Sequence, residues 1–380
     1  MNHLTTTRRL TALAGGLMGL AAAGSASALE FSVGDTTLGV YGYAKLDIIY
    51  DVDDDLGISV NHLAISRDDE RSSTGHSTLH AYESRLGFST STPLEGSVLN
   101  TRIEGDFYGG GGGQFRLRHA YGEWNGILAG QTWTNFHGFV AATPTVSFTG
   151  LGGMPNTSRQ AQLRYTQGNF SVALEDPDKL GGREETFGLG ADKSRLPDLT
   201  LRYTRRADDF AVSTSAVLRH LEYDAIDQDD STLGWGVALE GALNVSEAVT
   251  LRAGVTHGDG IGSYLNENPT STPAIDAAPA YVGADGRLRT VESTGGTLGM
   301  TVKVGPGSIN AAYYRTVTDL DDSPYPGETS DRRESFFLNY IWSPVERVSY
   351  GLEAGWHARE TLDGREGEAV RLQGMVKYSF

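Results

Sequence analysis

Short segments in which apolar and polar residues alternate recur along nearly the whole chain. In one of the clearest, Leu99, Ile103 and Phe107 share one face, while Arg102 and Glu104 share the other. A period of two is typical of a β-strand with one apolar and one polar face. About sixteen such segments occur, an even number, as a closed bacterial β-barrel requires.

The connections between these segments are alternately tight and long. The Asn125-Gly126 pair predicts a type I′ hairpin, whereas long loops are expected over 51–78 and 258–294. The last segment is amphipathic and ends on Phe380, a pattern typical of chains that the outer-membrane assembly machinery inserts. We therefore predict an all-β fold, a transmembrane antiparallel β-barrel. Its strands are expected at 38–50, 79–90, 99–107, 115–121, 127–134, 159–166, 170–176, 199–206, 210–221, 232–243, 249–257, 295–303, 308–317, 334–343, 348–358 and 368–380.

The composition is compatible with this fold. Hydrophobic residues make up only 39% of the chain, but only alternate residues of a barrel strand face lipid. No apolar run after Leu29 reaches the roughly 18 residues of a membrane-spanning helix. A soluble β-sandwich of this length would need several domains with linkers, and a propeller would need blade-length repeats. The sequence has neither, so a single barrel is favoured.

The first residues predict export. Arg8 and Arg9 precede an apolar stretch at 10–24, and Ala26-Ser27-Ala28 has the form of a cleavage site. We expect residues 1–28 to be a cleaved signal peptide and 29–380 to be the barrel domain, located in the outer membrane of a Gram-negative cell. A permanent N-terminal membrane helix is disfavoured, because the apolar stretch is too short. The chain has no cysteine, so its stability is expected to come from closed strand pairing.

One long connection, residues 135–158, lacks strand alternation and is apolar for a segment expected outside the cell. Exposure of its large apolar residues to water would be unfavourable, and Pro144 and several glycines permit turns that bring the segment inward. We expect it to fold into the barrel as a constriction loop that carries Phe136, Phe139 and Phe148. Packing against a neighbouring subunit is the alternative.

The predicted inner face is basic, although the whole chain has a net charge of −17. That acidic balance disfavours nucleic acid as a partner. The six acidic residues of the inner face are Asp47, Glu83, Glu104, Asp106, Glu240 and Glu353. Its basic residues are Lys45, Arg85, Arg102, Arg116, Arg118, Arg164, Arg202, Arg206, Arg219, Arg252, Lys303, Arg371 and Lys377.

Such an excess of cations inside low-dielectric walls should concentrate anions, and guanidinium groups pair well with carboxylates. Some of these cations will instead pair with wall carboxylates, as Arg102 beside Glu104 suggests. The residues expected to line the pore and contact solutes are Arg116, Arg118, Arg102, Lys45, Arg85, Arg164, Arg202 and Arg252.

Most other carboxylates cluster in the expected outer loops, at 51–55, 68–70, 184–185, 227–230 and 319–322. Their simplest role is to keep these loops solvated and apart. Binding of divalent cations that bridge lipopolysaccharide is the alternative.

The sequence carries no motif that predicts catalysis, a cofactor or a metal site. Gly109 to Gly113 lacks the lysine and helix of a phosphate loop, and the histidines lack metal-binding spacing. An outer-membrane hydrolase would need a Ser/His or Asp/His constellation, which distant residues could still form in space. We therefore expect a protein that is not an enzyme.

Two motifs connect the chain with a known family. Residues 115–124 (FRLRHAYGEW) and 128–136 (LAGQTWTNF) resemble the DcaP-like porins, with weaker matches at 41–47 and 84–88. The resemblance implies a sixteen-stranded, trimeric channel that favours negatively charged solutes such as dicarboxylates and phthalate-like acids. It also implies that Arg116 and Arg118 line the passage. Some relatives carry a coiled coil before the first strand, and this sequence has no heptads there.

These observations favour an anion-preferring porin that forms a homotrimer in contact with outer-membrane lipid and lipopolysaccharide. A general diffusion porin, whose arginines only shape the field, is the main alternative. An adhesin or phage receptor that uses the outer loops is a third class.

Overall fold

The computed structural model describes residues 29–68, 70, 74–177, 192–193, 195–225, 228–271 and 277–380. The predicted signal peptide and the acidic pair at 184–185 lie outside these residues. Within the described residues, no helix has the length and hydropathy needed to cross a bilayer.

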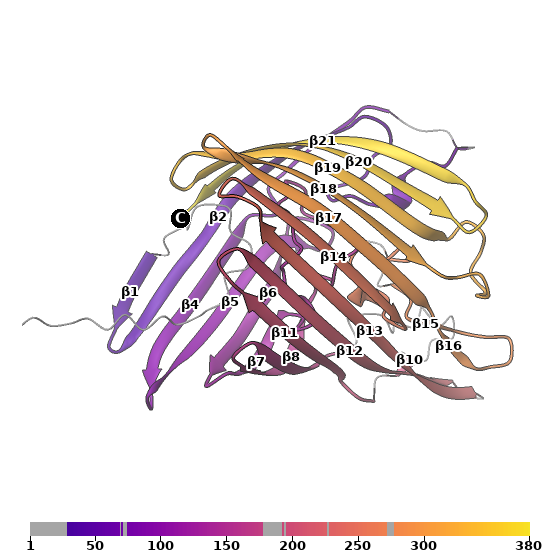
Figure 1. Cartoon of the computed structure of the whole chain (residues 1–380), viewed down its shortest axis with the longest axis horizontal. Coiled ribbons are helices and arrows are strands. Elements are labelled where there is room, and N and C mark those ends of the chain that lie inside the picture. The colour runs from indigo at the N-terminus through magenta and orange to yellow at the C-terminus, as the bar shows by residue number, and fades with distance from the viewer. Residues whose placement is uncertain are drawn as a thin grey trace, which may run out of the picture.

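In the described part of the chain, sixteen antiparallel strands form a closed barrel (Figure 1). Each strand pairs with the next along the chain, and the ring closes where the last strand pairs with the first. The wall strands are β2 (Thr36–Asp51), β3 with β4 (His76–His80 and Arg85–Leu94), β5 (Ser97–Gly109), β6 (Gln114–Trp124), β7 (Ile127–Trp133), β8 (Arg159–Gln167), β9 (Phe170–Glu175), β11 (Asp198–Arg206), β12 (Phe210–Ala225), β13 (Gln228–Asn244), β14 (Val249–Asp259), β17 (Glu292–Val304), β18 (Gly307–Thr318), β19 (Ser330–Val345), β20 (Val348–Thr361) and β21 (Glu366–Ser379).

The remaining elements extend or cover the wall. Strand β1 (Leu29–Val33), which the alternation did not predict, pairs with the beginning of β2. The short β10 (Asp192–Lys193) pairs with β12. The predicted loop 258–294 contains a 3-10 helix, η2 (Gly262–Tyr264), and a hairpin of β15 (Ala280–Val282) and β16 (Leu288–Thr290). A second 3-10 helix, η1 (His62–Ala64), follows β2.

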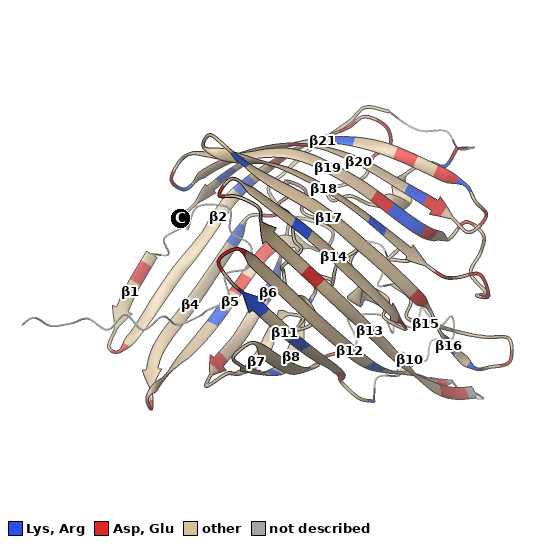
Figure 2. Ribbon diagram, in the orientation of Figure 1, with Lys and Arg blue, Asp and Glu red and all other residues tan. Residues whose placement is uncertain are grey.

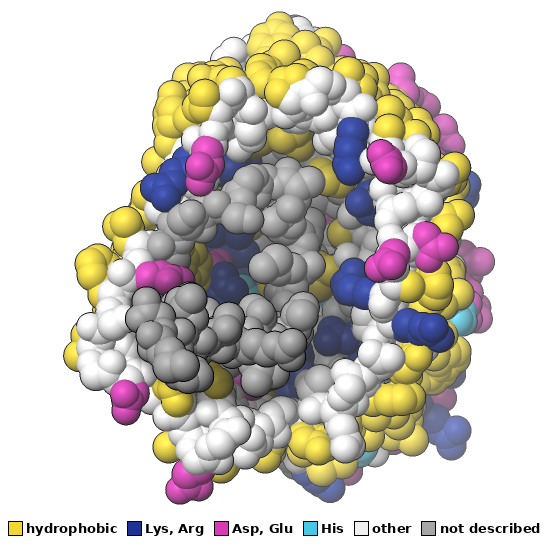
Figure 3. Space-filling view, turned by 60° about the vertical axis from the view of Figure 1, so that its left-hand side comes forward, with side chains coloured by type: hydrophobic (Ala, Val, Ile, Leu, Met, Phe, Trp, Pro, Cys, Tyr) yellow, Lys and Arg dark blue, Asp and Glu magenta, His cyan; other side chains and the backbone are white. Residues whose placement is uncertain are grey.

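The predicted alternation is confirmed by burial. On β13, for example, Leu239 is 53% exposed on the outside, whereas its neighbour Glu240 is buried on the inside. Apolar side chains cover the outer surface, and basic side chains lie in the hollow (Figure 3). A barrel with an apolar exterior and a polar interior is the arrangement that a bilayer requires, because lipid cannot satisfy backbone polar groups and closure leaves no open strand edge.

The turn chemistry is also confirmed at Asn125-Gly126, where both residues have positive φ angles, of 50° and 77°. A type I′ hairpin requires these angles, and asparagine and glycine adopt them most easily.

The predicted strand at 79–90 is wrong in one respect, because the wall breaks between β3 and β4. At the break, the Ser84 hydroxyl accepts a hydrogen bond from the Lys45 amide (3.0 Å) in place of a neighbouring strand's carbonyl. The turn directs Glu83 into the barrel, where it pairs with the Lys45 ammonium group. The break therefore brings a charged side chain into the lumen.

The interpretation of the 51–55 cluster as solvated loop residues is wrong for Asp51 and Asp54. Asp51 is buried and accepts two hydrogen bonds from Arg371, at 2.6 and 2.8 Å. Asp54 is also buried, and it accepts hydrogen bonds from the amide and hydroxyl groups of Ser66. These carboxylates fix the fold of the loop that follows β2.

Candidate channel constriction

The apolar segment that follows β7 lies inside the barrel, held against the inner face of the wall. Its residues Phe136, Val140, Val146, Leu151 and Met154 are all buried, at 0–4% exposure. Because the segment forms no regular ladder, its backbone N–H and C=O groups need other partners. Side chains of the wall supply many of them.

Glu175, the last residue of β9, holds the beginning of the segment. Its carboxylate accepts hydrogen bonds from the Thr134 hydroxyl (2.7 Å) and the Asn135 amide (2.5 Å). The side chains of Gln160 and Thr200 also donate to it. Sequence reasoning missed this residue, because its role depends on strands β8 and β11 lying beside β9.

Glu240 on β13 holds the next part. Its carboxylate accepts hydrogen bonds from the amides of Gly138 (2.8 Å), Val140 (2.6 Å) and Ala141 (3.2 Å). His137 Nδ1 lies 3.3 Å from the same carboxylate. One wall carboxylate therefore holds three backbone amides of the segment between Gly138 and Ala141.

Glu353 on β20 holds the far part, across the lumen. It accepts hydrogen bonds from the amides of Val146 and Ser147, both at 2.8 Å. Wall cations complement these carboxylates by donating to the segment's carbonyl groups. Lys45 donates to the Val146 carbonyl at 3.1 Å, and Arg202 donates to the His137 carbonyl at 2.5 Å.

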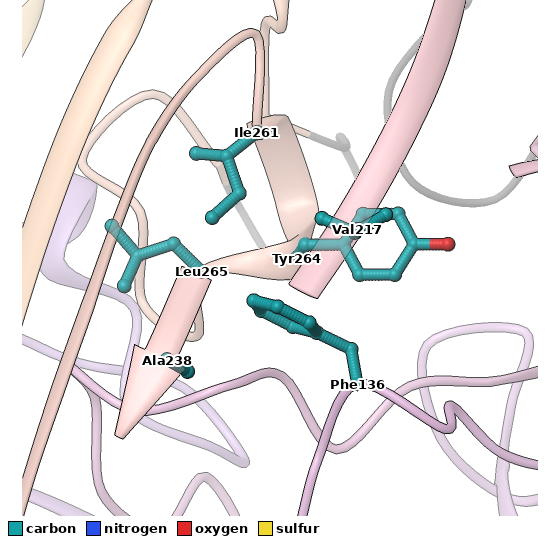
Figure 4. Packing of buried hydrophobic residues seen from close by; sticks show 6 residues of the cluster. All are labelled: Phe136, Val217, Ala238, Ile261, Tyr264 and Leu265. Carbon is teal, nitrogen blue, oxygen red and sulfur yellow. The ribbon is translucent and has the colours of Figure 1, made fainter. Parts of the chain in front are cut away.

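An apolar cluster completes the attachment (Figure 4). Phe136 is fully buried and packs with Val217, Ala238, Ile261, Tyr264 and Leu265. The ring of Phe136 meets that of Tyr264 edge to face, with centroids 5.6 Å apart. Of the three predicted constriction phenylalanines, Phe136 is thus an anchor, whereas Phe139 and Phe148 line an open cavity.

This cavity has a volume of about 830 Å³ and lies between the segment and the wall. Its lining contains seven basic residues and two acidic ones, Glu83 and Glu104. Two further carboxylates, Asp47 and Asp106, contact the same cations from behind. The seven basic residues are Lys45, Arg85, Arg102, Arg116, Arg118, Arg159 and Lys377.

Four of these cations are paired with carboxylates, and Figure 2 marks the charged positions on the wall. Arg118 lies 2.9 Å from Glu104 and 2.8 Å from Asp106. Arg102 extends the row from Glu104 (2.5 Å), and Arg116 extends it from Asp106 (2.7 Å). The pairing of β5 with β6 produces this row, because Arg116 lies directly opposite Asp106.

Lys45 is the fourth paired cation. Its ammonium group contacts Asp47 at 3.0 Å and also Glu83, and it is almost fully buried.

The structure therefore brings five of the eight predicted pore-lining residues around one cavity. The other three lie elsewhere on the inner face. Arg164 donates to Gln162 at 2.8 Å, Arg202 holds the segment, and Arg252 donates to Thr301 at 2.7 Å. Sequence reasoning missed Arg159, since alternation in the predicted strand 159–166 puts it on the same face as Ala161 and Leu163, the face assigned to lipid.

A buried constellation elsewhere brings together a serine, a histidine and a carboxylate. His62 Nε2 lies 3.0 Å from Ser335 Oγ, and His62 Nδ1 lies 3.3 Å from Glu267. Burial lowers the pKa of His62. Ser335 is fully buried, which leaves its hydroxyl no path to a substrate. The contacts instead tie two loops to the wall.

Comparisons with known proteins settle the family. The model of the DcaP outer membrane protein family matches residues 21–380. The chain belongs to this family. A solved structure, the outer membrane channel DcaP of Acinetobacter baumannii, has the same fold as this chain. The two share 24% sequence identity with a TM-score of 0.77, over 92% of this chain and 99% of that one.

More distant solved structures share the barrel. OmpT of Vibrio cholerae is 13% identical with a TM-score of 0.58, over 92% of this chain and 100% of its own. An anion-selective porin from Comamonas acidovorans is 12% identical with a TM-score of 0.57, over 91% of this chain and 100% of its own. No curated protein matches the sequence. This DcaP-family protein is an outer-membrane channel with the porin fold.

Proposed function

We propose that this channel takes up small hydrophilic solutes with a preference for anionic organic acids. The observation that carries the proposal is the charge around the cavity, where seven cations meet two lining carboxylates and two more behind them. Charge of one sign between low-dielectric walls focuses the field and raises the local concentration of counter-ions. Pore linings of one sign are an established selectivity device.

The side chains around the cavity favour carboxylates among anions. Guanidinium groups offer planar pairs of N–H donors that match a carboxylate. Aromatic rings at Trp133, Phe139 and Phe148 add flat apolar surface to the lining. Dicarboxylates and phthalate-like acids combine these features, so we propose them as the solute class. That one distant structural neighbour is an anion-selective porin agrees with this proposal.

We further propose that the channel works as a homotrimer in contact with outer-membrane lipid and lipopolysaccharide. One of the OmpT structures with this fold is a trimer form. A general diffusion porin without substrate preference is the second candidate. It is supported by the four cations that pair with wall carboxylates and so contribute little net charge.

The reversal potential across a salt gradient tests the proposal. In planar bilayers with a tenfold KCl gradient, the channel is expected to pass chloride in preference to potassium. Liposomes containing the channel are expected to take up succinate faster than an uncharged sugar of similar size. A reversal potential near zero, with equal uptake of both solutes, would favour the general diffusion porin.

A further inference from the structure

The positive charge of the cavity is unevenly shared among its seven cations. Four of the cations pair with four carboxylates, so the charges of these two sets cancel. These cations are Lys45, Arg102, Arg116 and Arg118. The remaining excess of three positive charges lies on Arg85, Arg159 and Lys377.

The three remaining cations lie over aromatic rings, as Arg102, Arg116 and Arg118 also do, and differ from these in lacking a close carboxylate. The Arg159 guanidinium lies 4.4 Å from the centre of the Trp133 ring. Arg85 and Lys377 both lie over Tyr43, at 5.4 and 5.3 Å. Within the described residues, Arg159 and Lys377 have no carboxylate partner, and the nearest carboxylate to Arg85 is Glu104 at 4.0 Å.

An arginine that is paired with a carboxylate and one that lies only against an aromatic ring differ in how many of their N–H donors remain free. A carboxylate occupies the N–H donors of an arginine, so a passing solute must displace it. An aromatic ring contacts the face of the guanidinium and leaves the N–H donors at its edge free. Arg85 Nε is in fact a buried donor without a hydrogen-bond partner.

From this arrangement we propose that Arg85, Arg159 and Lys377 are the residues that contact a passing anion. The paired arginines, including Arg116 and Arg118 of the FRLR motif, hold the wall in shape. This inference rests on the proposed anion preference and names the residues that determine it. It differs from the expectation drawn from the family resemblance, which placed the contact on Arg116 and Arg118.

The test compares loss of an unpaired cation with loss of a whole ion pair. Arg159→Gln is expected to lower the chloride-to-potassium permeability ratio by roughly fivefold, as loss of one nearby charge should in partly screened surroundings. The double variant Arg116→Gln with Asp106→Asn removes one charge of each sign and is expected to leave the ratio unchanged. An equal fall in both variants would overturn the inference.

Further variants test separately where the charge lies and how its donor groups are arranged. Lys303 lies on the inner face of β17 outside the cavity lining, so Lys303→Gln matches Lys377→Gln in chemistry but not in place. Only the change at Lys377 is expected to lower the ratio. Arg159→Lys keeps the charge but loses the planar donors, so it is expected to keep the KCl ratio while weakening block of chloride current by succinate.

These outcomes separate the two proposals. If the unaltered channel shows no anion preference, the proposed function fails. If the unaltered channel prefers anions, but Arg159→Gln and Lys377→Gln behave like Lys303→Gln, only the assignment of the contact residues fails. Heat-modifiable migration in SDS gels verifies that each variant is a folded barrel.

Discussion

Replacing Glu240 with glutamine is expected to raise single-channel conductance and make the current noisier. The carboxylate accepts three amide hydrogen bonds from Gly138, Val140 and Ala141. Glutamine has one acceptor oxygen, and its NH2 group would face amide donors. Hydrogen bonds to a charged acceptor contribute about 1.5–3 kcal/mol each. The glutamine oxygen can keep the Val140 and Ala141 bonds, so at least the Gly138 bond is lost, at about 1.5–3 kcal/mol, which favours the detached segment by roughly tenfold or more.

The detached segment would no longer divide the lumen beside the cavity, so ions would cross a wider passage. Single-channel recording in planar bilayers measures the effect. Glu247→Gln, in the exposed turn before β14, makes the same chemical change outside the barrel and is expected to leave conductance unaltered. A folded Glu240→Gln variant with the conductance and noise of the unaltered channel would mean that Phe136 and Glu353 suffice to hold the segment.

The wall of the barrel could be predicted from sequence because a bilayer imposes a simple rule on each strand. Leu239 faces lipid and Glu240 faces the lumen wherever their neighbours lie, so alternation alone assigns both. The break before β4 escaped prediction because it depends on Ser84 replacing a backbone partner of Lys45, a contact between residues far apart in sequence.

The site could be predicted less completely, for a related reason. Alternation places Arg116 and Arg118 inside, but their partner Asp106 comes from the register of β5 against β6, which includes two irregularities. Pairing decides whether a cation is free for a solute, and pairing is set by register. Arg159 escaped prediction for a different reason. Its contact with Trp133 arises where the inward segment rejoins the wall.

Replacing Arg118 with methionine is expected to destabilise the barrel by about 3 kcal/mol or more, as loss of one partner from a buried ion pair usually does. Arg118 is 1% exposed and lies between Glu104 and Asp106, both buried. Methionine fills similar space but leaves the two carboxylates with the partly exposed Arg102 and Arg116 as their closest cations. The barrel loses stability because the negative charge of Glu104 and Asp106 is then incompletely compensated in a poorly solvated part of the wall.

Urea unfolding of the channel in lipid vesicles measures this cost. Arg67→Met removes one partner of the solvent-screened Arg67–Glu70 pair in the loop after η1 and is expected to leave the stability nearly unchanged. Adding Asp106→Asn to Arg118→Met restores the balance of charge and is expected to recover part of the lost stability, since Glu104 keeps Arg102. If Arg118→Met cost no more than Arg67→Met, the buried row would not support the wall, and Arg118 would be available to contact anions after all.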